Sequence, residues 1–198
     1  MTARRMVVAI GSNLGDRLTT VRRAMRAIAG LPGVEPIAAS SVYETPALTP
    51  TGVDETAPRY LNAVVTFRSA RAPEEVLTDL QGLERRFGRL RTGRWASRTL
   101  DLDLVDVDGL ELHGERLQLP HPRAWERAFV LVPWHEIEPD ASIPGRGPIG
   151  ELLAAASDRV ELFAAAEAAG GAPGTDRGLP LVGPGSALPG RPPAEDVP

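Results

Sequence analysis

RWASRTLDLDL, residues 94–104, is the stretch from which the fold and the chemistry of this chain are best predicted. From Thr99 onward, leucine alternates with aspartate, which is the period of a β-strand. The leucines then point to one face of the strand, and Asp101 and Asp103 point to the other. We therefore expect an apolar face that packs on a core and an acidic face that meets a ligand.

The two aspartates are close enough to need a cation. Residues two apart on a strand have Cα atoms about 6.6 Å apart, and like charges at this range raise each other's pKa. Mg²⁺ prefers oxygen ligands and shares them with substrate phosphates. Guanidinium groups bind the remaining phosphate oxygens, and the candidates are Arg89, Arg91, Arg94 and Arg98. The pattern favours a site for a nucleotide polyphosphate, although an edge strand with two solvated aspartates is the alternative that Asp-x-Asp alone leaves open.

Length and composition indicate one globular domain followed by a tail. The chain has 198 residues, of which 42% are hydrophobic and 24% charged, as in ordinary globular proteins. We expect a domain over residues 1–165 and a disordered tail over 166–198, because glycine and proline make up 14 of the last 29 residues. No apolar run approaches the roughly 20 residues that cross a bilayer. We expect a cytoplasmic monomer with no membrane partner.

The absence of two residue types excludes several kinds of chemistry. The chain has no cysteine, which excludes disulfides, thiolate metal sites and cysteine nucleophiles. All 22 basic residues are arginine, which excludes a Walker A phosphate loop and Schiff-base mechanisms. Phosphate chemistry must therefore use arginine, histidine and metal. The net charge of −4 argues against nucleic acid as a partner.

The order of the predicted elements indicates the fold class. In chain order we expect a strand at 6–10, a helix at 18–28, a strand at 34–43, a long loop to residue 59, a strand at 60–67, a helix at 73–87 and a strand from 99. This βαββαβ order is that of the α+β ferredoxin-like fold, an antiparallel sheet with helices packed on it. A hairpin turn at Asp108-Gly109 and helices at 122–132 and 149–155 are expected to follow.

Some polar residues near the acidic strand have two interpretations. His121 ends an extended segment near Arg116, and it is either structural or part of a phosphate site. Asn62 at a strand start either pairs with neighbouring strands or recognises the edge of a heterocycle. Gln81 and Glu84 are neighbours on one side of a helix, and they either form a solvated surface or lie at the end of the arginine loop.

With these motifs placed, the chain resembles the 6-hydroxymethyl-7,8-dihydropterin pyrophosphokinase family, whose members move diphosphate from ATP to a pterin alcohol in the folate pathway. The resemblance runs from about Val7 to Asp140. Its motifs are Ala9-Ile10-Gly11-Ser12-Asn13-Leu14-Gly15, Tyr43-x-Thr45-Pro46, Tyr60-Leu61-Asn62-Ala63, Glu84 with Gly88-Arg89, Arg94-Trp95 with Arg98-Thr99-Leu100-Asp101-Leu102-Asp103, Pro120-His121, and Arg127-x-Phe129-Val130-Leu131-x-Pro133. Their order and spacing together carry the resemblance.

The resemblance implies a role for each matching position. Asp101 and Asp103 are implied to hold two Mg²⁺ ions that bridge the ATP phosphates, and the implied catalytic set adds Arg89, Arg98 and His121. The implied ATP-binding positions are Gln81, Glu84, Arg91, Leu104, Arg116, His121 and Arg127. The implied pterin-binding positions are Thr45, Pro46, Leu48, Tyr60, Asn62, Trp95 and Phe129, with the pterin stacked between Tyr60 and Phe129.

The chain departs from the family pattern at three places. The loop between Arg91 and Trp95 is one residue shorter, and Thr92 stands where a basic residue is familiar. Pro122 follows His121 where some members carry an aromatic residue. The segment from Thr51 to Arg59 is long. These differences concern how the loops close over the substrates.

Two other classes of protein share single features with this chain. A two-metal nucleotidyltransferase also uses Gly-Ser and Asp-x-Asp, but on one continuous unit, whereas Ser12 and Asp101 are far apart here. A ferredoxin-like RNA-binding module could use the arginines from Arg85 to Arg98, but such modules stack bases on strand aromatics within an Arg/Lys-Gly-Phe/Tyr motif, and that motif is missing here. Pyrophosphokinase activity accounts for more of the motifs than either alternative.

Overall fold

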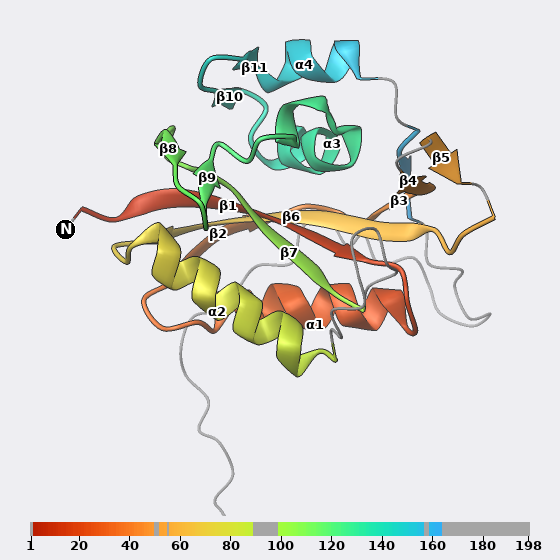
Figure 1. Ribbon diagram of the computed structural model, residues 1–198, viewed down its shortest axis with the longest axis horizontal. Coiled ribbons are helices and arrows are strands. Elements are labelled where there is room, and N and C mark those ends of the chain that lie inside the picture. The colour runs from red at the N-terminus through yellow and green to blue at the C-terminus, as the bar shows by residue number, and fades with distance from the viewer. Residues whose placement is uncertain (1, 50–51, 55, 89–98, 157–158, 164–198) are drawn as a thin grey trace, which may run out of the picture.

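The computed structural model describes residues 2–49, 52–54, 56–88, 99–156 and 159–163 (Figure 1). The predicted tail and most of the predicted arginine loop lie outside this part of the chain. No helix within the described residues combines the length and the apolar character that crossing a bilayer requires.

The main sheet has β1 (Arg4–Ser12) near its centre. β1 pairs antiparallel with β6 (Tyr60–Ser69) on one side and with β7 (Asp101–Val107) on the other. On the far side of β6 lie β2 (Glu35–Ala39) and β3 (Tyr43–Thr45), and β12 (Glu161–Leu162) pairs with β3. The order β3-β6-β1-β7, all antiparallel, confirms the predicted ferredoxin-like arrangement.

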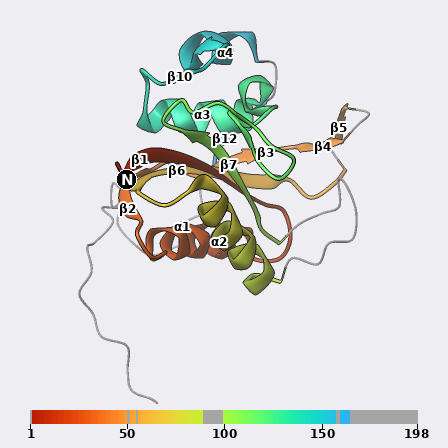
Figure 2. The same ribbon diagram turned by 60° about the vertical axis from the view of Figure 1, so that its left-hand side comes forward.

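One face of the sheet packs against α1 (Arg17–Ala29) and α2 (Pro73–Arg86), as Figures 1 and 2 show. α1 begins where the Asp16 carboxylate accepts a hydrogen bond from the Thr19 backbone N–H, and α2 begins with Pro73 in its first turn. Leu100, Leu102 and Leu104 join the core on this face. The predicted apolar side of the Asp-x-Asp strand is confirmed.

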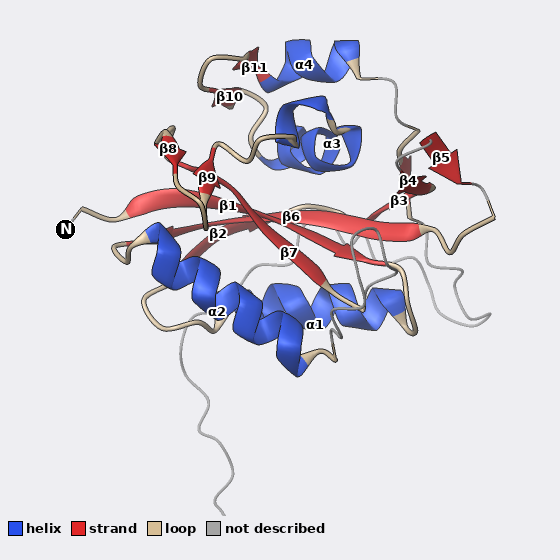
Figure 3. Ribbon diagram, in the orientation of Figure 1, coloured by secondary structure: helices blue, strands red, loops and turns tan. Residues whose placement is uncertain are grey.

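The opposite face carries α3 (Ala128–Ile137) and α4 (Ile149–Ala155), so the sheet lies between two helical layers (Figure 3). Val7, Val64 and Leu131 belong to a second buried apolar cluster there. The remaining elements are the short helix η1 (Ala124–Glu126) and the two-stranded pairs β4 (Ala47–Thr49) with β5 (Gly52–Asp54), β8 (Leu112–His113) with β9 (Gln118–Leu119), and β10 (Ser142–Ile143) with β11 (Gly147–Pro148).

Three predicted boundaries are wrong. The strand predicted at 34–43 is interrupted, because the Ser40 hydroxyl accepts the Val64 N–H at 2.9 Å in place of a regular ladder bond. The predicted long loop contains the β4–β5 hairpin, with Gly52 at a positive φ of 116° in its turn region. The helix predicted at 122–132 is divided into η1 and α3, and α3 continues to Ile137 with Pro133 inside it.

A buried ion-pair cluster attaches α3 to the sheet. Asp106 is fully buried, and its Oδ2 accepts a hydrogen bond from Arg5 at 2.8 Å. Arg5 also pairs with Glu138, which accepts a hydrogen bond from the Trp134 indole at 2.9 Å. Burial raises the pKa of Asp106 above its ordinary value, and the Arg5 guanidinium opposes that rise. Arg5 therefore favours the ionised form of a carboxylate that is buried between the sheet and α3.

We expect Arg5→Ala to destabilise the protein by about 3 kcal/mol at pH 7, because it leaves Asp106 buried without its cation. Without Arg5 the folded-state pKa of Asp106 rises further, so protonation at pH 4 removes much of the cost. The loss should therefore be larger at pH 7 than at pH 4. Chemical denaturation at both pH values measures it, with the exposed Arg4→Ala as control. An equal loss at both pH values would contradict this account.

Candidate active site

The acidic face of β7 lies on the same side of the sheet as α3. In the ladder, Asp101 is the partner of Gly11 and Asp103 is the partner of Ala9. Both aspartates are half-buried. Their neighbours on β1 are the two smallest residue types, so the backbone of β1 leaves space beside both carboxylates. As predicted, β7 has two carboxylates on one face, and the part of β1 beside them carries no bulky side chain.

Gly11 separates the acidic residues from a second polar group. A Cβ at Gly11 would lie 3.5 Å from Asn62 Oδ1, 3.8 Å from Asp101 Cβ and 3.8 Å from Tyr60 Cδ1. Asn62 is the partner of Gly11 on β6, so Asp101, Gly11 and Asn62 form one row across three strands. The carboxylate and the amide face the same space from its two sides.

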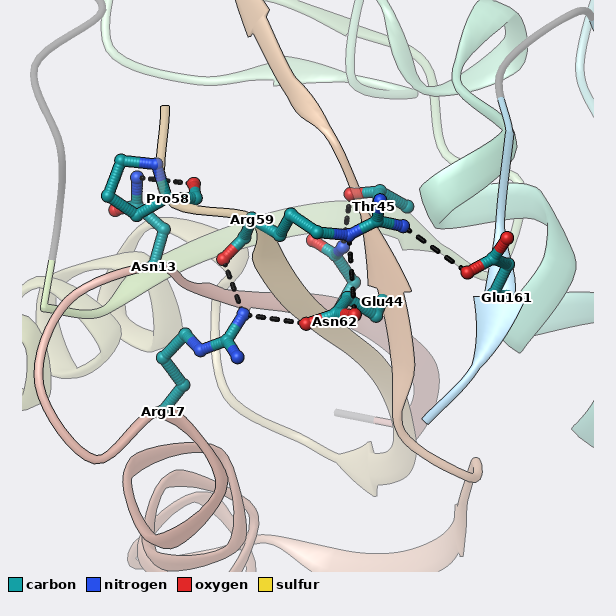
Figure 4. A network of polar contacts seen from close by, with 8 residues as sticks. All are labelled: Asn13, Arg17, Glu44, Thr45, Pro58, Arg59, Asn62 and Glu161. Atoms are coloured by element: carbon teal, nitrogen blue, oxygen red, sulfur yellow. Dashed lines mark hydrogen bonds and ion pairs between the residues drawn. The ribbon is translucent and has the colours of Figure 1, made fainter. Parts of the chain in front are cut away.

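Four of the residues expected to bind a pterin lie on the β6 side of this row, and Figure 4 shows two of them, Thr45 and Asn62. Asn62 Nδ2 donates a hydrogen bond to Thr45 Oγ1 at 2.9 Å, and both residues are buried. This bond orients the Asn62 amide, so that its Oδ1 is directed toward Gly11. Tyr60 is the ladder partner of Thr45 and is half-buried, and Pro46 is buried beside them. Four of the predicted pterin residues are therefore neighbours.

His121 and Arg127 reach the acidic face from the opposite end. The His121 backbone N–H donates to the Val105 carbonyl at 2.8 Å, which extends the contact with β7. Its Nδ1 accepts the Arg123 N–H at 3.3 Å, so the neutral ring carries its proton on Nε2. Burial lowers the pKa of His121 below its ordinary value, and Asp103 opposes that fall.

The Asp103 carboxylate also affects the pKa of Arg127. Burial lowers the pKa of Arg127, and Asp103 again acts in the opposite direction. The guanidinium carbon lies 5.4 Å from the centre of the Phe129 ring, which is the distance of a cation–π contact. Asp103 therefore has a histidine and an arginine within its electrostatic range, together with an aromatic ring at the start of α3.

The other predicted ATP residues lie on α2, beside it, or on the core-facing side of β7. Glu84 is buried, and its Oε1 accepts the Leu102 backbone N–H at 3.0 Å, on the edge strand β7. Gln81 lies one turn earlier on α2, and Arg116 donates to Thr78 on the same helix at 3.3 Å. Leu104 is only 2% exposed, and its side chain packs in the core on the face away from the aspartates. These residues border β7 but do not join the acidic face.

The predicted loop residues cannot be placed. Arg89, Arg91, Arg94, Trp95 and Arg98 lie outside the described residues, and of Leu48 the structure gives only its position in β4. Thr99 follows that loop, and its carbonyl accepts a hydrogen bond from Ser12 Oγ at 2.7 Å. Thr99 is thereby attached to the end of β1.

One group near the site was not predicted from the sequence. Arg17 donates to Glu44 at 2.8 Å and to the Arg59 carbonyl at 2.7 Å, next to the predicted pterin residues (Figure 4). The helix predicted at 18–28 does not include Arg17. The available signal was the position of its partners, since Glu44 lies inside the Tyr43-x-Thr45-Pro46 motif and Arg59 directly precedes the Tyr60-Leu61-Asn62-Ala63 motif.

The donor set suits a cation that is shared with a substrate. Within the described residues, no group of three or more histidine, aspartate and glutamate side chains could hold a metal ion on its own. Asp101 and Asp103 offer two carboxylates, and a hard cation bound there would take its other oxygen ligands from phosphate and water. Together with His121 and Arg127, these carboxylates make a set of side chains that is typical of enzymes that transfer phosphate groups.

Comparison with known proteins makes the assignment specific. The family model described as 7,8-dihydro-6-hydroxymethylpterin-pyrophosphokinase (HPPK) matches residues 7–139, and the chain belongs to this family. A 2-amino-4-hydroxy-6-hydroxymethyldihydropteridine pyrophosphokinase of Synechocystis sp. is 40% identical over 141 residues, covering 71% of this chain and 70% of the relative. The protein of that name from Methylorubrum extorquens is 36% identical over 160 residues, covering 79% of this chain and 99% of the relative.

Solved structures support the fold. The HPPK-DHPS of Plasmodium falciparum, solved with pterin and p-hydroxybenzoate, has a TM-score of 0.58 at 13% identity. The match covers 78% of this chain and 43% of that chain, so our protein spans less than half of its length. The predicted family and the predicted fold are both confirmed, and the predicted class of enzyme, a diphosphotransferase, is that of the family. The roles of single residues remain predictions.

We expect the pKa of His121, measured by NMR in protein without added metal, to lie below its ordinary value of 6.5. Asp103→Asn should lower it further, because the variant removes a negative charge that favours the imidazolium form. The exposed Asp140→Asn serves as a control for a general loss of negative charge. A His121 pKa that does not fall in Asp103→Asn would show that Asp103 does not act on the ring.

Proposed function

We propose that this protein transfers diphosphate from ATP to 6-hydroxymethyl-7,8-dihydropterin and releases AMP, a step of folate biosynthesis. The observation that carries the proposal is the row Asp101–Gly11–Asn62. It sets a carboxylate for phosphate-bound metal and an amide for a heterocycle on two sides of one open position. A transferase of this kind needs its nucleotide and its acceptor next to each other.

The residues present fit Mg²⁺. Asp101 and Asp103 lie on one face of β7, and an acidic pair of this kind is stabilised by a divalent cation that also binds phosphate oxygens. Two Mg²⁺ ions are the expected occupants. When bound, they would neutralise charge on the phosphate oxygens of ATP.

His121 and Arg127 supply the protein's own contacts to phosphate. Because burial keeps the His121 pKa low and Nδ1 accepts the Arg123 N–H, neutral His121 presents Nε2–H as a hydrogen-bond donor. Arg127 adds a fixed positive charge on the same side of Asp103. A donor and a cation placed before the reaction stabilise charge that develops on the transferred group.

Arg89 and Arg98, which lie outside the described residues, complete the catalytic set that the resemblance implies. The hydroxymethyl oxygen of the pterin attacks the β-phosphorus of ATP and loses its proton to solvent, and the bond from that phosphorus to the oxygen bridging the α-phosphate breaks. AMP leaves with the bridging oxygen. Asn62 and Thr45 would orient the heterocycle through hydrogen bonds, and Tyr60 and Phe129 would stack on it. Their roles follow from the resemblance and from their positions near Gly11.

We expect purified protein with Mg²⁺ and ATP to release AMP only when hydroxymethyl-dihydropterin is present. Asp101→Asn and Asp103→Asn should each lower kcat by about 10²-fold or more, because each removes charge that the transition state requires. Chromatographic analysis of the nucleotides measures both effects. Release of ADP would indicate a simple kinase, and release of pyrophosphate with nucleotidyl transfer would indicate a nucleotidyltransferase. Either result would disprove the proposal.

Gly11→Ala should lower the activity of the site without destabilising the fold. The new methyl group would meet its neighbours at ordinary contact distances, so the protein should fold with a melting temperature equal to or above that of the wild type. The methyl group would occupy space between Asn62 and Asp101, and we expect kcat/KM to fall by roughly tenfold to 10²-fold. Thermal melting and the AMP assay test this pair of outcomes. Unchanged kcat/KM in a folded variant would show that substrates do not use this space.

A further inference from the structure

Four charged side chains form a chain of contacts beside the proposed pterin site, which we name the charged clasp: Arg17, Glu44, Arg59 and Glu161 (Figure 4). Glu44 Oε1 accepts from Arg17 at 2.8 Å, and Glu44 Oε2 lies 3.3 Å from Arg59 Nε. Arg59 Nη2 lies 3.4 Å from Glu161. Positive and negative side chains alternate in this series of contacts. The charged clasp therefore joins α1, β3, the start of β6 and β12 without net charge.

Arg17 of the clasp also forms a hydrogen bond to backbone that lies outside the β3–β6 ladder. The β3–β6 ladder reaches Tyr60, the partner of Thr45, and the residues before Tyr60 lie beyond it. Arg17 Nη1 donates to the Arg59 carbonyl at 2.7 Å, and Asn13 Nδ2 donates to the Pro58 carbonyl at 3.4 Å. Side chains from the β1–α1 turn thus hold the carbonyls just before β6.

The clasp and the proposed pterin residues alternate along the chain but lie on opposite sides of the sheet. Glu44 is followed by Thr45, and Arg59 is followed by Tyr60. Because successive side chains of a strand point to opposite faces, Glu44 turns toward α1 while Thr45 turns toward Asn62. Any effect of the clasp on the pterin must therefore pass through the backbone.

Burial makes these contacts stronger than ordinary surface pairs. The Arg17 and Glu44 side chains are 27% and 22% exposed, and Arg59 is 29% exposed. Glu44 contacts both guanidinium groups, one with each oxygen, so its loss would leave two cations facing each other. Arg17 contacts both a carboxylate and a carbonyl, so its loss would remove one of the two cations that Glu44 contacts and would also release the Arg59 carbonyl.

We propose that the charged clasp is a positioning device for the pterin: it fixes the two ends of the 46–59 segment so that Tyr60 stays next to Thr45 and Asn62. The inference rests on the proposed function, because it assigns the ring of Tyr60 to the pterin. The clasp residues do not touch the acidic face, and they set the affinity for the acceptor without changing nucleotide binding.

The test is the kinetics of Arg17→Ala with each substrate varied in turn. We expect KM for hydroxymethyl-dihydropterin to rise by about tenfold, as for the loss of a charged hydrogen bond, while kcat and KM for ATP stay within about twofold. Arg22→Ala, an exposed residue of the same helix, is the matched control and should leave all three parameters unchanged. Glu44→Gln keeps the shape of the side chain and makes the same test if Arg17→Ala does not fold.

The double variant Arg17→Ala/Glu44→Gln tests whether the two residues act as a unit. The fold-increase in its KM for the pterin should be well below the product of the increases in the two single variants, because both substitutions break the same contact. Multiplicative effects, or equal increases in both KM values, would overturn the positioning role. Wild-type protein that releases no AMP would overturn the proposed function as well, whereas an active wild type with an unchanged pterin KM in Arg17→Ala would overturn the clasp alone.

Discussion

Antiparallel pairing between β1 and β7 is the constraint on which the site depends. The register places Asp101 beside Gly11 and Asp103 beside Ala9, and the same register directs the leucines of β7 into the core between the sheet and its helices. A shift by one residue would bury the carboxylates and expose the leucines, so the energy of the core maintains the geometry of the site. The register changes only between Val7 and Val8, past the acidic pair.

Although both belong to β7, aspartates on the two sides of this change of register have different surroundings. Beyond it, Asp106 is fully buried and pairs with Arg5, which attaches α3 to the sheet. Before it, Asp103 is half-buried and acts on His121 and Arg127, which come from the segment leading into α3. The Arg5 cluster therefore does more than stabilise the fold, because the position of α3 decides where His121 and Arg127 meet the acidic face.

Sequence alone was sufficient for the order of the elements because the apolar patterns are local. Leucine and aspartate alternate within β7, and the stripes of α1 and α2 repeat at helical spacing. The break at Ser40 was not predictable in this way, since it depends on a side chain that replaces a ladder bond to Val64, a partner 24 positions away. The division of the helix near Arg127 likewise depends on how α3 packs on the sheet.

The same distinction explains which site residues could be found. Asp101 and Asp103 come from one continuous strand, so their spacing alone puts both carboxylates on one face. The proposed pterin side is different, because Thr45 and Tyr60 lie at opposite ends of the 46–59 segment and meet only through the β3–β6 ladder. A site closed by two distant segments needs contacts that hold the segments, and such contacts join residues such as Arg59 and Glu161, which are 102 positions apart. No local pattern reveals them, which is why a motif identifies the residues facing the ligand more readily than those that hold them in place.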